Sequence, residues 1–235
     1  MRKNGGAYLL SLALAVLLLM PALSTASILS WPSEWQADSA FYQVWSRADM
    51  PVQSAVAARS WLWGPVPFAV ANEAYGESST GLRLVEYLDK GRMEVNDPGG
   101  NRTTSWFVTS GLLVTEMVTG QLQTGNATFE QHSPAIVPIA GDEGVASVPT
   151  YASFSLLLGP AAKSLAADKL ILRDGTLSPL SPPGDPSLSA SSAYDDVTKH
   201  NIPSVFNSWM HSSGTVFEDG KLVNGLPFDP LYVLG

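Results

Sequence analysis

Glycine and proline occur so often in this chain that they divide it into short segments. The sequence contains 20 glycines and 17 prolines, and only 14% of its residues are charged. Glycine and proline disfavour the interiors of helices and strands, so this composition predicts short elements joined by many turns. We therefore expect an α+β fold of short antiparallel strands and hairpins with a few short helices.

The chain has no cysteine, but it has seven tryptophans. It can form neither disulfides nor metal sites with thiolate ligands. Its stability must therefore come from an apolar core, and the tryptophans are large enough to supply much of that core.

The first 26 residues have the features of a secretory signal peptide. Arg2 and Lys3 precede an uncharged apolar run at residues 8–20, and residues 24–26 are small, as at a cleavage site. The run has 13 residues, whereas a membrane-spanning helix needs about 20. We expect a secreted, extracellular or cell-surface protein with no membrane span after signal cleavage; an uncleaved anchor is the weaker alternative.

The charge balance argues against two classes of partner. The net charge is −8, and removal of Arg2 and Lys3 with the leader would make it −10. Phosphate backbones and anionic membrane surfaces attract clustered Lys and Arg, so we expect neither nucleic acid nor a membrane surface as a partner.

Residues 82–95 are predicted to form a β-hairpin. A two-residue turn at Lys90-Gly91 would place Asp89 opposite Arg92, where opposite charges attract. The alternation of side chains then gives the hairpin two different faces. One face carries Leu84, Glu86, Leu88, Met93 and Val95, and the other carries Arg83, Val85, Tyr87, Arg92 and Glu94.

Several other segments have recognisable local patterns. Phe41, Val44 and Trp45 share one face of a short helix expected to end before Pro51. Asp219-Gly220 is the strongest turn signal in the chain and predicts a hairpin over residues 216–223. We also expect strands at residues 105–109 and 135–139, a helix at 150–158, and a helix at 111–119 closed by Gly120, with a strand as the alternative for 111–119.

Composition also predicts the domain organisation. Of residues 174–193, 12 are Pro, Ser or Gly, which is typical of a linker or a long surface loop. The pattern at 41–45 and 61–64 is weakly echoed at 205–209 and 232–235, although coincidence is an equal alternative. The predicted parts are a signal peptide (1–26), a main domain (27–172), a linker (173–193) and a second, truncated module (194–235).

Residues 61–65 (WLWGP) and 84–94 (LVEYLDKGRME) resemble recurring motifs of a family of uncharacterised secreted bacterial proteins. Further similar segments lie at 111–116, 120–126 and 205–235, so the resemblance covers most of the chain after the leader. Members of that family continue beyond the equivalent of Gly235, which supports the expected truncation. The resemblance implies no reaction, and it makes an accessory role beside cell-wall or peptidase domains plausible.

No catalytic, metal-binding or cofactor motif is found in the sequence. His132, His200 and His211 lack metal-ligand spacing, and neither a nucleophile elbow nor a phosphate-binding loop is present. Scattered acids such as Glu73 and Glu86 are the basis of one alternative, an exported hydrolase acting on cell-wall glycan or peptide.

The weak ligand-binding candidates are aromatic: Trp61, Trp63, Tyr75 and Tyr87. Indole and phenol rings can stack on sugar rings, but a fold without disulfides needs large buried side chains, which favours a place in the core. We expect a secreted, non-catalytic module that binds a cell-surface glycan or an envelope protein. A scaffold whose exposed strand edges bind a partner chain is a further alternative.

Overall fold

The computed structural model describes residues 40–139, 147–163, 168–181 and 191–228. All of them belong to the second of two compact units, Trp31–Gly235. The predicted signal peptide and the echo segment at 232–235 lie outside the described residues. No helix among the described residues is both long enough and apolar enough to cross a bilayer.

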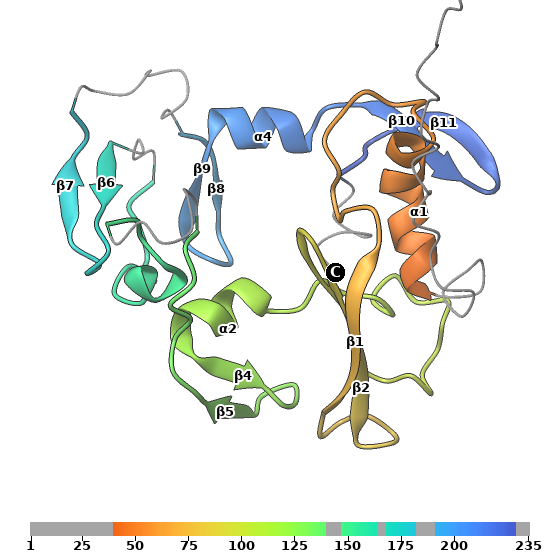
Figure 1. Ribbon diagram of the computed structural model, residues 1–235, viewed down its shortest axis with the longest axis horizontal. Coiled ribbons are helices and arrows are strands. Elements are labelled where there is room, and N and C mark those ends of the chain that lie inside the picture. Colours follow the sequence, from red (N-terminus) through yellow and green to blue (C-terminus); the bar gives the residue numbers. More distant parts are fainter. Residues whose placement is uncertain (1–39, 140–146, 164–167, 182–190, 229–235) are drawn as a thin grey trace, which may run out of the picture. The chain divides into compact units, whose positions relative to one another are not determined.

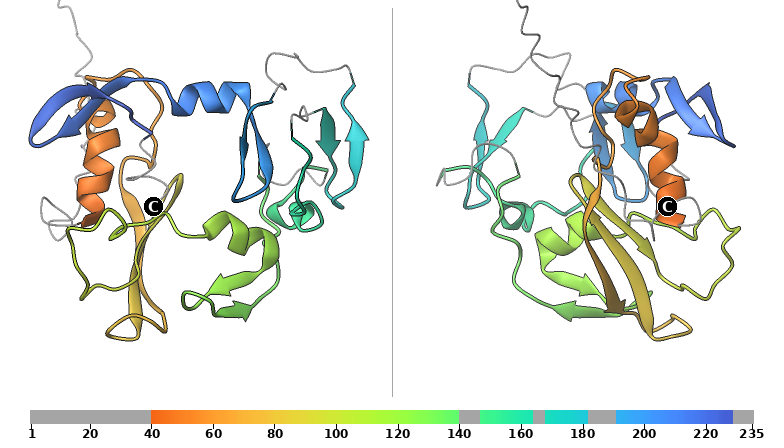
Figure 2. Two further views of the ribbon diagram at one scale, coloured as in Figure 1. Left: turned by 180° about the vertical axis from the view of Figure 1, so that it is seen from behind. Right: turned by 45° about the vertical axis from the view of Figure 1, so that its right-hand side comes forward.

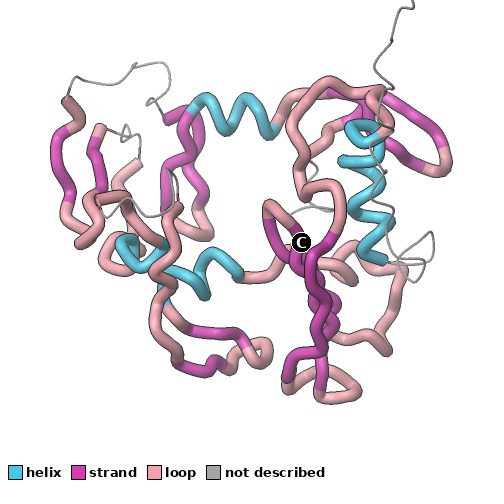
Figure 3. Tube along the Cα trace, viewed as in Figure 1, coloured by secondary structure: helices cyan, strands magenta, loops and turns pink. Residues whose placement is uncertain are grey.

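The expected α+β class is confirmed: short helices alternate with strands that pair antiparallel with their neighbours (Figures 1 and 3). The first half contains α1 (Ala40–Gln53), β1 (Pro67–Ala74), β2 (Leu82–Leu88), β3 (Gly91–Val95), α2 (Leu113–Thr119), β4 (Gln121–Gln123) and β5 (Phe129–Gln131). The second half contains η2 (Tyr151–Phe154), β6 (Lys169–Ile171), β7 (Leu177–Pro179), β8 (Ser191–Asp195), β9 (His200–Pro203), α4 (Ser204–Met210), β10 (Gly214–Glu218) and β11 (Lys221–Gly225).

The core forms where α1 packs against the three-stranded sheet β1–β2–β3, whose strands lie side by side in Figure 2. Phe41, Val44 and Trp45 share the buried face of α1, as their spacing predicts. Pro51 was expected beyond the helix, but it lies inside the last turn of α1 and is buried. Proline removes the bond that its N–H would make to Arg47 O and crowds that carbonyl, and α1 ends two residues later at Gln53.

The β2–β3 hairpin forms, but its predicted register is wrong by two residues. Leu88 pairs with Gly91 and Tyr87 with Arg92, which places the turn at Asp89-Lys90. Lys90 N donates to Trp63 O at 3.1 Å, and a Cβ on Gly91 would approach the Trp63 ring to 3.4 Å. Gly91 thus lies directly against the indole ring. A shift of two residues preserves side-chain direction, so the predicted division into two faces is correct.

Other local expectations had mixed outcomes. α2 ends at Gly120 with the left-handed φ of +74° that its sequence predicts. Residues 105–109 form no strand, and only Thr109 bridges to Glu94. Residues 135–139 are likewise irregular apart from a bridge between Pro138 and Thr150.

The helix expected at 150–158 is only the short 3-10 helix η2. Its start is fixed by a capping box, in which Thr150 N donates to Ser153 Oγ at 2.9 Å. Gly159-Pro160 follows a few residues later and disfavours a longer helix.

Parts of the predicted linker and second module have regular structure. β7 and the start of β8 fall within residues 173–193. The hairpin β10–β11 turns at Asp219-Gly220, as predicted. Arg47 of α1 pairs with Glu218 of β10 through Nη2 and Oε1 at 2.6 Å, and it donates to Leu226 O at 2.8 Å. The predicted domain boundaries remain a prediction.

Candidate functional site

The face of the β1–β2–β3 sheet that points away from the apolar core carries a charged cluster. The cluster consists of Glu73, Arg83, Arg92, Glu94 and Glu116. Arg83 pairs with Glu73 at 2.8 Å and with Glu94 at 3.2 Å. Arg92 pairs with Glu116 of α2 at 2.7 Å and also contacts Glu94. The two arginines and Glu94 are almost completely buried. These charges are therefore taken from water, and each is compensated by a partner.

Two tyrosines complete this face. Tyr87 Oη donates to Glu73 Oε1 at 2.6 Å, and the guanidinium of Arg83 lies 5.5 Å from the centroid of the Tyr75 ring. Burial alone raises the pKa of Glu73, but the hydrogen bonds from Tyr87 and Arg83 and the arginine charges outweigh it and hold that pKa below its ordinary value. Burial and the neighbouring Glu73 raise the pKa of the Tyr87 phenol.

Burial has the larger effect on Glu94. It raises the pKa of this carboxyl more than the positive charges of Arg92 and Arg83 lower it. Gly111 lies so close to Glu94 that an added Cβ would be 2.1 Å from Oε1. The backbone at Gly111 therefore closes the cluster on the side of α2, and a side chain there would displace the carboxylate.

Glu86 lies on the opposite face of the hairpin, which is the core face. Its cross-strand neighbours are Val70 and Met93, and its side chain has no exposed surface. Neither carboxyl oxygen has a hydrogen-bond partner among the described residues. Burial raises the pKa of Glu86 from 4.5 to about 8, so the carboxyl is protonated at neutral pH.

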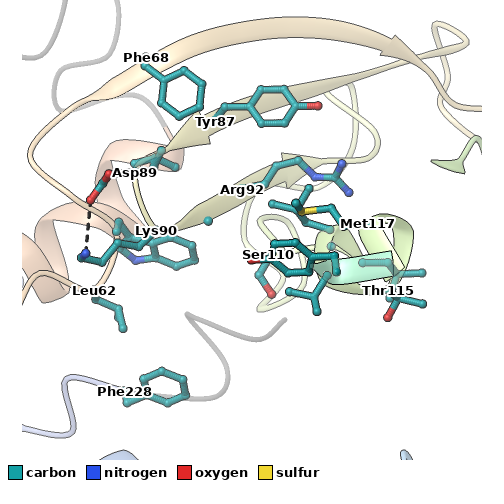
Figure 4. A pocket seen from close by; sticks show the side chains of 18 residues that line it. Leu62, Phe68, Tyr87, Asp89, Lys90, Arg92, Ser110, Thr115, Met117 and Phe228 are labelled. Atoms are coloured by element: carbon teal, nitrogen blue, oxygen red, sulfur yellow. Dashed lines mark ion pairs between the residues drawn. The ribbon is translucent and has the colours of Figure 1, made fainter. Parts of the chain in front are cut away.

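A pocket of about 660 Å³ opens at the turn end of the β2–β3 hairpin. We call it the hairpin pocket. Phe68 and Tyr87 lie on one side of it, with ring centroids 6.3 Å apart, and Phe228 lies on the other (Figure 4). The ion pair Asp89–Lys90, at 3.3 Å, lies at its edge. The apolar lining also includes Leu62, Trp63, Leu88, Leu112, Leu113, Val114 and Met117.

The four aromatic candidates occupy different places. Trp63 is 4% exposed and belongs to the core, although its ring forms part of the pocket wall. Trp61 packs against the core and is half-buried. Tyr75 is buried beside the charged cluster, where its hydroxyl donates to Asn126 Oδ1 at 2.8 Å. Only Trp63 and Tyr87 therefore meet at the pocket, and a role for the four residues in binding stays a prediction.

Glu73 and Glu86 do not form the pair that glycoside hydrolysis uses. That reaction needs two carboxyl groups facing one cleft, roughly 5 to 10 Å apart. Glu73 pairs with Arg83 on the charged face, whereas Glu86 points into the apolar core on the other side of the same sheet. Among the described residues, no group of three or more His, Asp or Glu is arranged to hold a metal ion.

The sequence did not reveal Glu116 or the exposed residues that line the hairpin pocket. Glu116 lies on a seven-residue helix whose other residues are apolar or hydroxyl-bearing. The sequence held one indirect signal for it. Two arginines and one glutamate share a predicted hairpin face, so a second carboxylate from elsewhere is needed if that face is buried. Phe68 and Val114 line the pocket and are exposed, but as single apolar residues they were indistinguishable from core residues in the sequence.

Comparison with known proteins adds no identity: no protein-family model, no curated protein and no solved structure matches this chain. The resemblance to secreted bacterial modules therefore stays a prediction, and any functional argument depends on the charged cluster and the hairpin pocket.

Proposed function

We propose that this protein is a secreted, non-catalytic module that binds an envelope protein, with the hairpin pocket as its binding site. One observation carries the proposal. An open, apolar pocket lies directly beside ionisable side chains that already form hydrogen bonds or ion pairs with one another. Tyr87 and Arg92 line the pocket, but Tyr87 is bonded to Glu73 and Arg92 to Glu116. Such a site favours holding a ligand over transforming it.

The pocket's chemistry favours a polypeptide over a sugar polymer. Most of its lining is apolar, with aliphatic side chains such as Leu62 and Leu112 beside aromatic ones such as Phe68. An apolar side chain of a partner protein fits such a pocket, because it transfers apolar surface out of water there. The edge residues Asp89 and Lys90 can then hydrogen-bond to the partner's backbone. Of the two tryptophans expected to stack on a glycan, Trp63 is buried and Trp61 does not line the pocket.

The hydrolase alternative receives less support. Its acids Glu73 and Glu86 are on opposite faces of one sheet, and the carboxyls of the charged cluster are neutralised by arginines. A general acid needs access to the bond that it protonates, and the core-facing position of Glu86 provides none.

The test is binding of the purified chain to envelope fractions of the source cell. Matched fractions are treated either with protease or with glycan-degrading enzymes. We expect binding to be lost after protease treatment and kept after glycan removal. Phe68→Ala should weaken it several-fold, since Phe68 is 73% exposed at the pocket and its removal spares the core.

Phe129→Ala is the matched control, because Phe129 is also exposed but lies on β5, outside the lining of the pocket. Equal loss in both variants would contradict a role for the pocket. Binding that survives protease and disappears with the glycan would replace the protein partner with a polymer. Release of cleaved products from either fraction would overturn the non-catalytic proposal.

A further inference from the structure

The outer edge of strand β1 is open from Val70 to Ala74. β1 pairs with β2 on one side only, and no other described strand joins it. Tyr75 N donates to Gly81 O, toward the β2 side of the chain, whereas Gly76 N donates to Thr124 O on the other side. Because backbone direction alternates along a strand, the N–H and C=O groups of Val70, Asn72 and Ala74 point away from β2.

These three residues therefore present three N–H and three C=O groups to the outside. None of the six has a hydrogen-bond partner among the described residues. Edge strands usually carry protection against pairing, such as lysine, inward-pointing charge or central proline. β1 has no lysine, its only proline is its first residue, and its only charge, Glu73, is held by Arg83.

The sequence of this edge is complementary to itself. If two copies pair antiparallel about Asn72, Val70 of each copy faces Ala74 of the other, so a larger side chain meets a small one. Glu73 would face Ala71, and the paired stretch would end at Ala74 of each copy, because Gly76 N already donates to Thr124 O on this edge. No charged side chain is opposed to its own copy, and like charges directly opposite each other are what most disfavours such pairing.

We propose that β1 is a self-association edge, at which two copies of this chain pair antiparallel about Asn72 and join their sheets into one of six strands. An isologous contact of this kind closes on itself and gives a dimer, not a fibre. Residues of the charged cluster remain inside each copy. The proposal depends on the open backbone of β1 and is independent of what the hairpin pocket binds.

The first test is the mass of the purified chain by sedimentation equilibrium over a range of concentrations. We expect a reversible doubling of mass, stronger at high salt, because salt screens the repulsion between two chains of net charge −8. Asn72→Lys and Asn72→Glu should each be monomeric where the unmodified chain is dimeric. An equimolar mixture of the two variants should regain the doubled mass, since opposite charges then meet at the axis.

Gln121→Lys is the matched control: it adds the same charge at an exposed position on β4 and should leave the dimer unchanged. A second test uses the absence of cysteine from the chain. Hydrogen-bonded antiparallel partners have Cα atoms about 5.5 Å apart, within the range of a disulfide. Asn72→Cys should therefore form a covalent dimer under mild oxidation, and Ala71→Cys, two residues out of register, should form much less.

A chain that stays monomeric at every concentration and salt level overturns the proposal. So does a dimer that both Asn72 charge variants leave intact, because its interface must then lie elsewhere. Equal oxidation of Asn72→Cys and Ala71→Cys would show that no register exists at this edge and would have the same consequence.

Discussion

Replacing Glu86 by glutamine should change how the stability of this protein depends on pH. In the folded chain the Glu86 carboxyl is buried without a hydrogen-bond partner among the described residues, and its pKa is raised from 4.5 to about 8. Its nearest strand neighbours, Val70 and Met93, are apolar, and burial is the only cause of the shift. The folded state therefore holds this proton more tightly than the unfolded chain does.

Proton linkage determines whether the free energy of unfolding rises or falls with pH. Below pH 4.5 the carboxyl is protonated in both states, and its stabilising contribution is fully present. As pH rises toward 8 the unfolded chain releases the proton first, so the free energy of unfolding falls. One pKa unit corresponds to about 1.4 kcal/mol, so the complete loss between pH 4.5 and 8 amounts to about 5 kcal/mol. At pH 7 about 3 to 4 kcal/mol of it has been lost.

Urea unfolding of the unmodified chain and of Glu86→Gln, measured in parallel from pH 4 to 9 (about the range in which the carboxyl titrates), isolates this effect. The difference between their free energies of unfolding should shift in favour of Glu86→Gln by about 5 kcal/mol across the range. All other titrating groups are common to both chains and cancel. Glu130→Gln, at an exposed carboxyl on β5, is the control and should show no such trend. Parallel curves for the unmodified chain and Glu86→Gln would refute an isolated, buried carboxyl.

Two further predictions concern the charged cluster, and both are measured by urea unfolding at neutral pH. Arg83→Met should destabilise the fold by about 3 to 5 kcal/mol, because it leaves the buried Glu94 with one partner fewer. Adding Glu94→Gln to this variant should recover at least about 1 kcal/mol. If nothing is recovered, the loss of stability comes from lost packing and not from the unpaired charge. Gly111→Ala combines a φ of +63° with a clash against Glu94 and should cost more than Gly81→Ala, which has a φ of +72° but open space around it. We expect about 1 to 2 kcal/mol for Gly81→Ala from backbone strain alone, and equal costs would contradict the clash.

Much of the hairpin could be predicted because its information is local. The alternation of apolar and charged residues from Arg83 to Val95 assigned each side chain to a face, and the structure keeps that assignment. The register was wrong because it depends on a distant residue. Trp63 packs over Gly91 and accepts a hydrogen bond from Lys90 N. Arg92, expected opposite Asp89, is instead buried and paired with Glu116 and Glu94.

The candidate site could be predicted only in part, for the same reason. Arg83, Arg92 and Glu94 were placed together on one face, but their burial depends on Glu116, which comes from a helix after a long loop. The pocket forms from residues that are far apart in sequence and individually unremarkable, such as Phe68 and Leu112. Periodicity detects which residues share an element, and it carries no information about which elements meet.

The two buried glutamates of the hairpin limit where its body can interact with anything else. Glu94 is compensated by two arginines on one face of the sheet. On the other face, burial among apolar side chains keeps Glu86 protonated. A ligand that opened either face would bring water to these carboxyl groups, whose charge state depends on burial. Rehydration of Glu86 would ionise it at neutral pH, and its return to the core would then cost several kcal/mol, as the pH argument requires. Both faces are therefore poor binding surfaces. What the sheet can offer without that cost is its turn end, where the hairpin pocket lies, and the free backbone of β1.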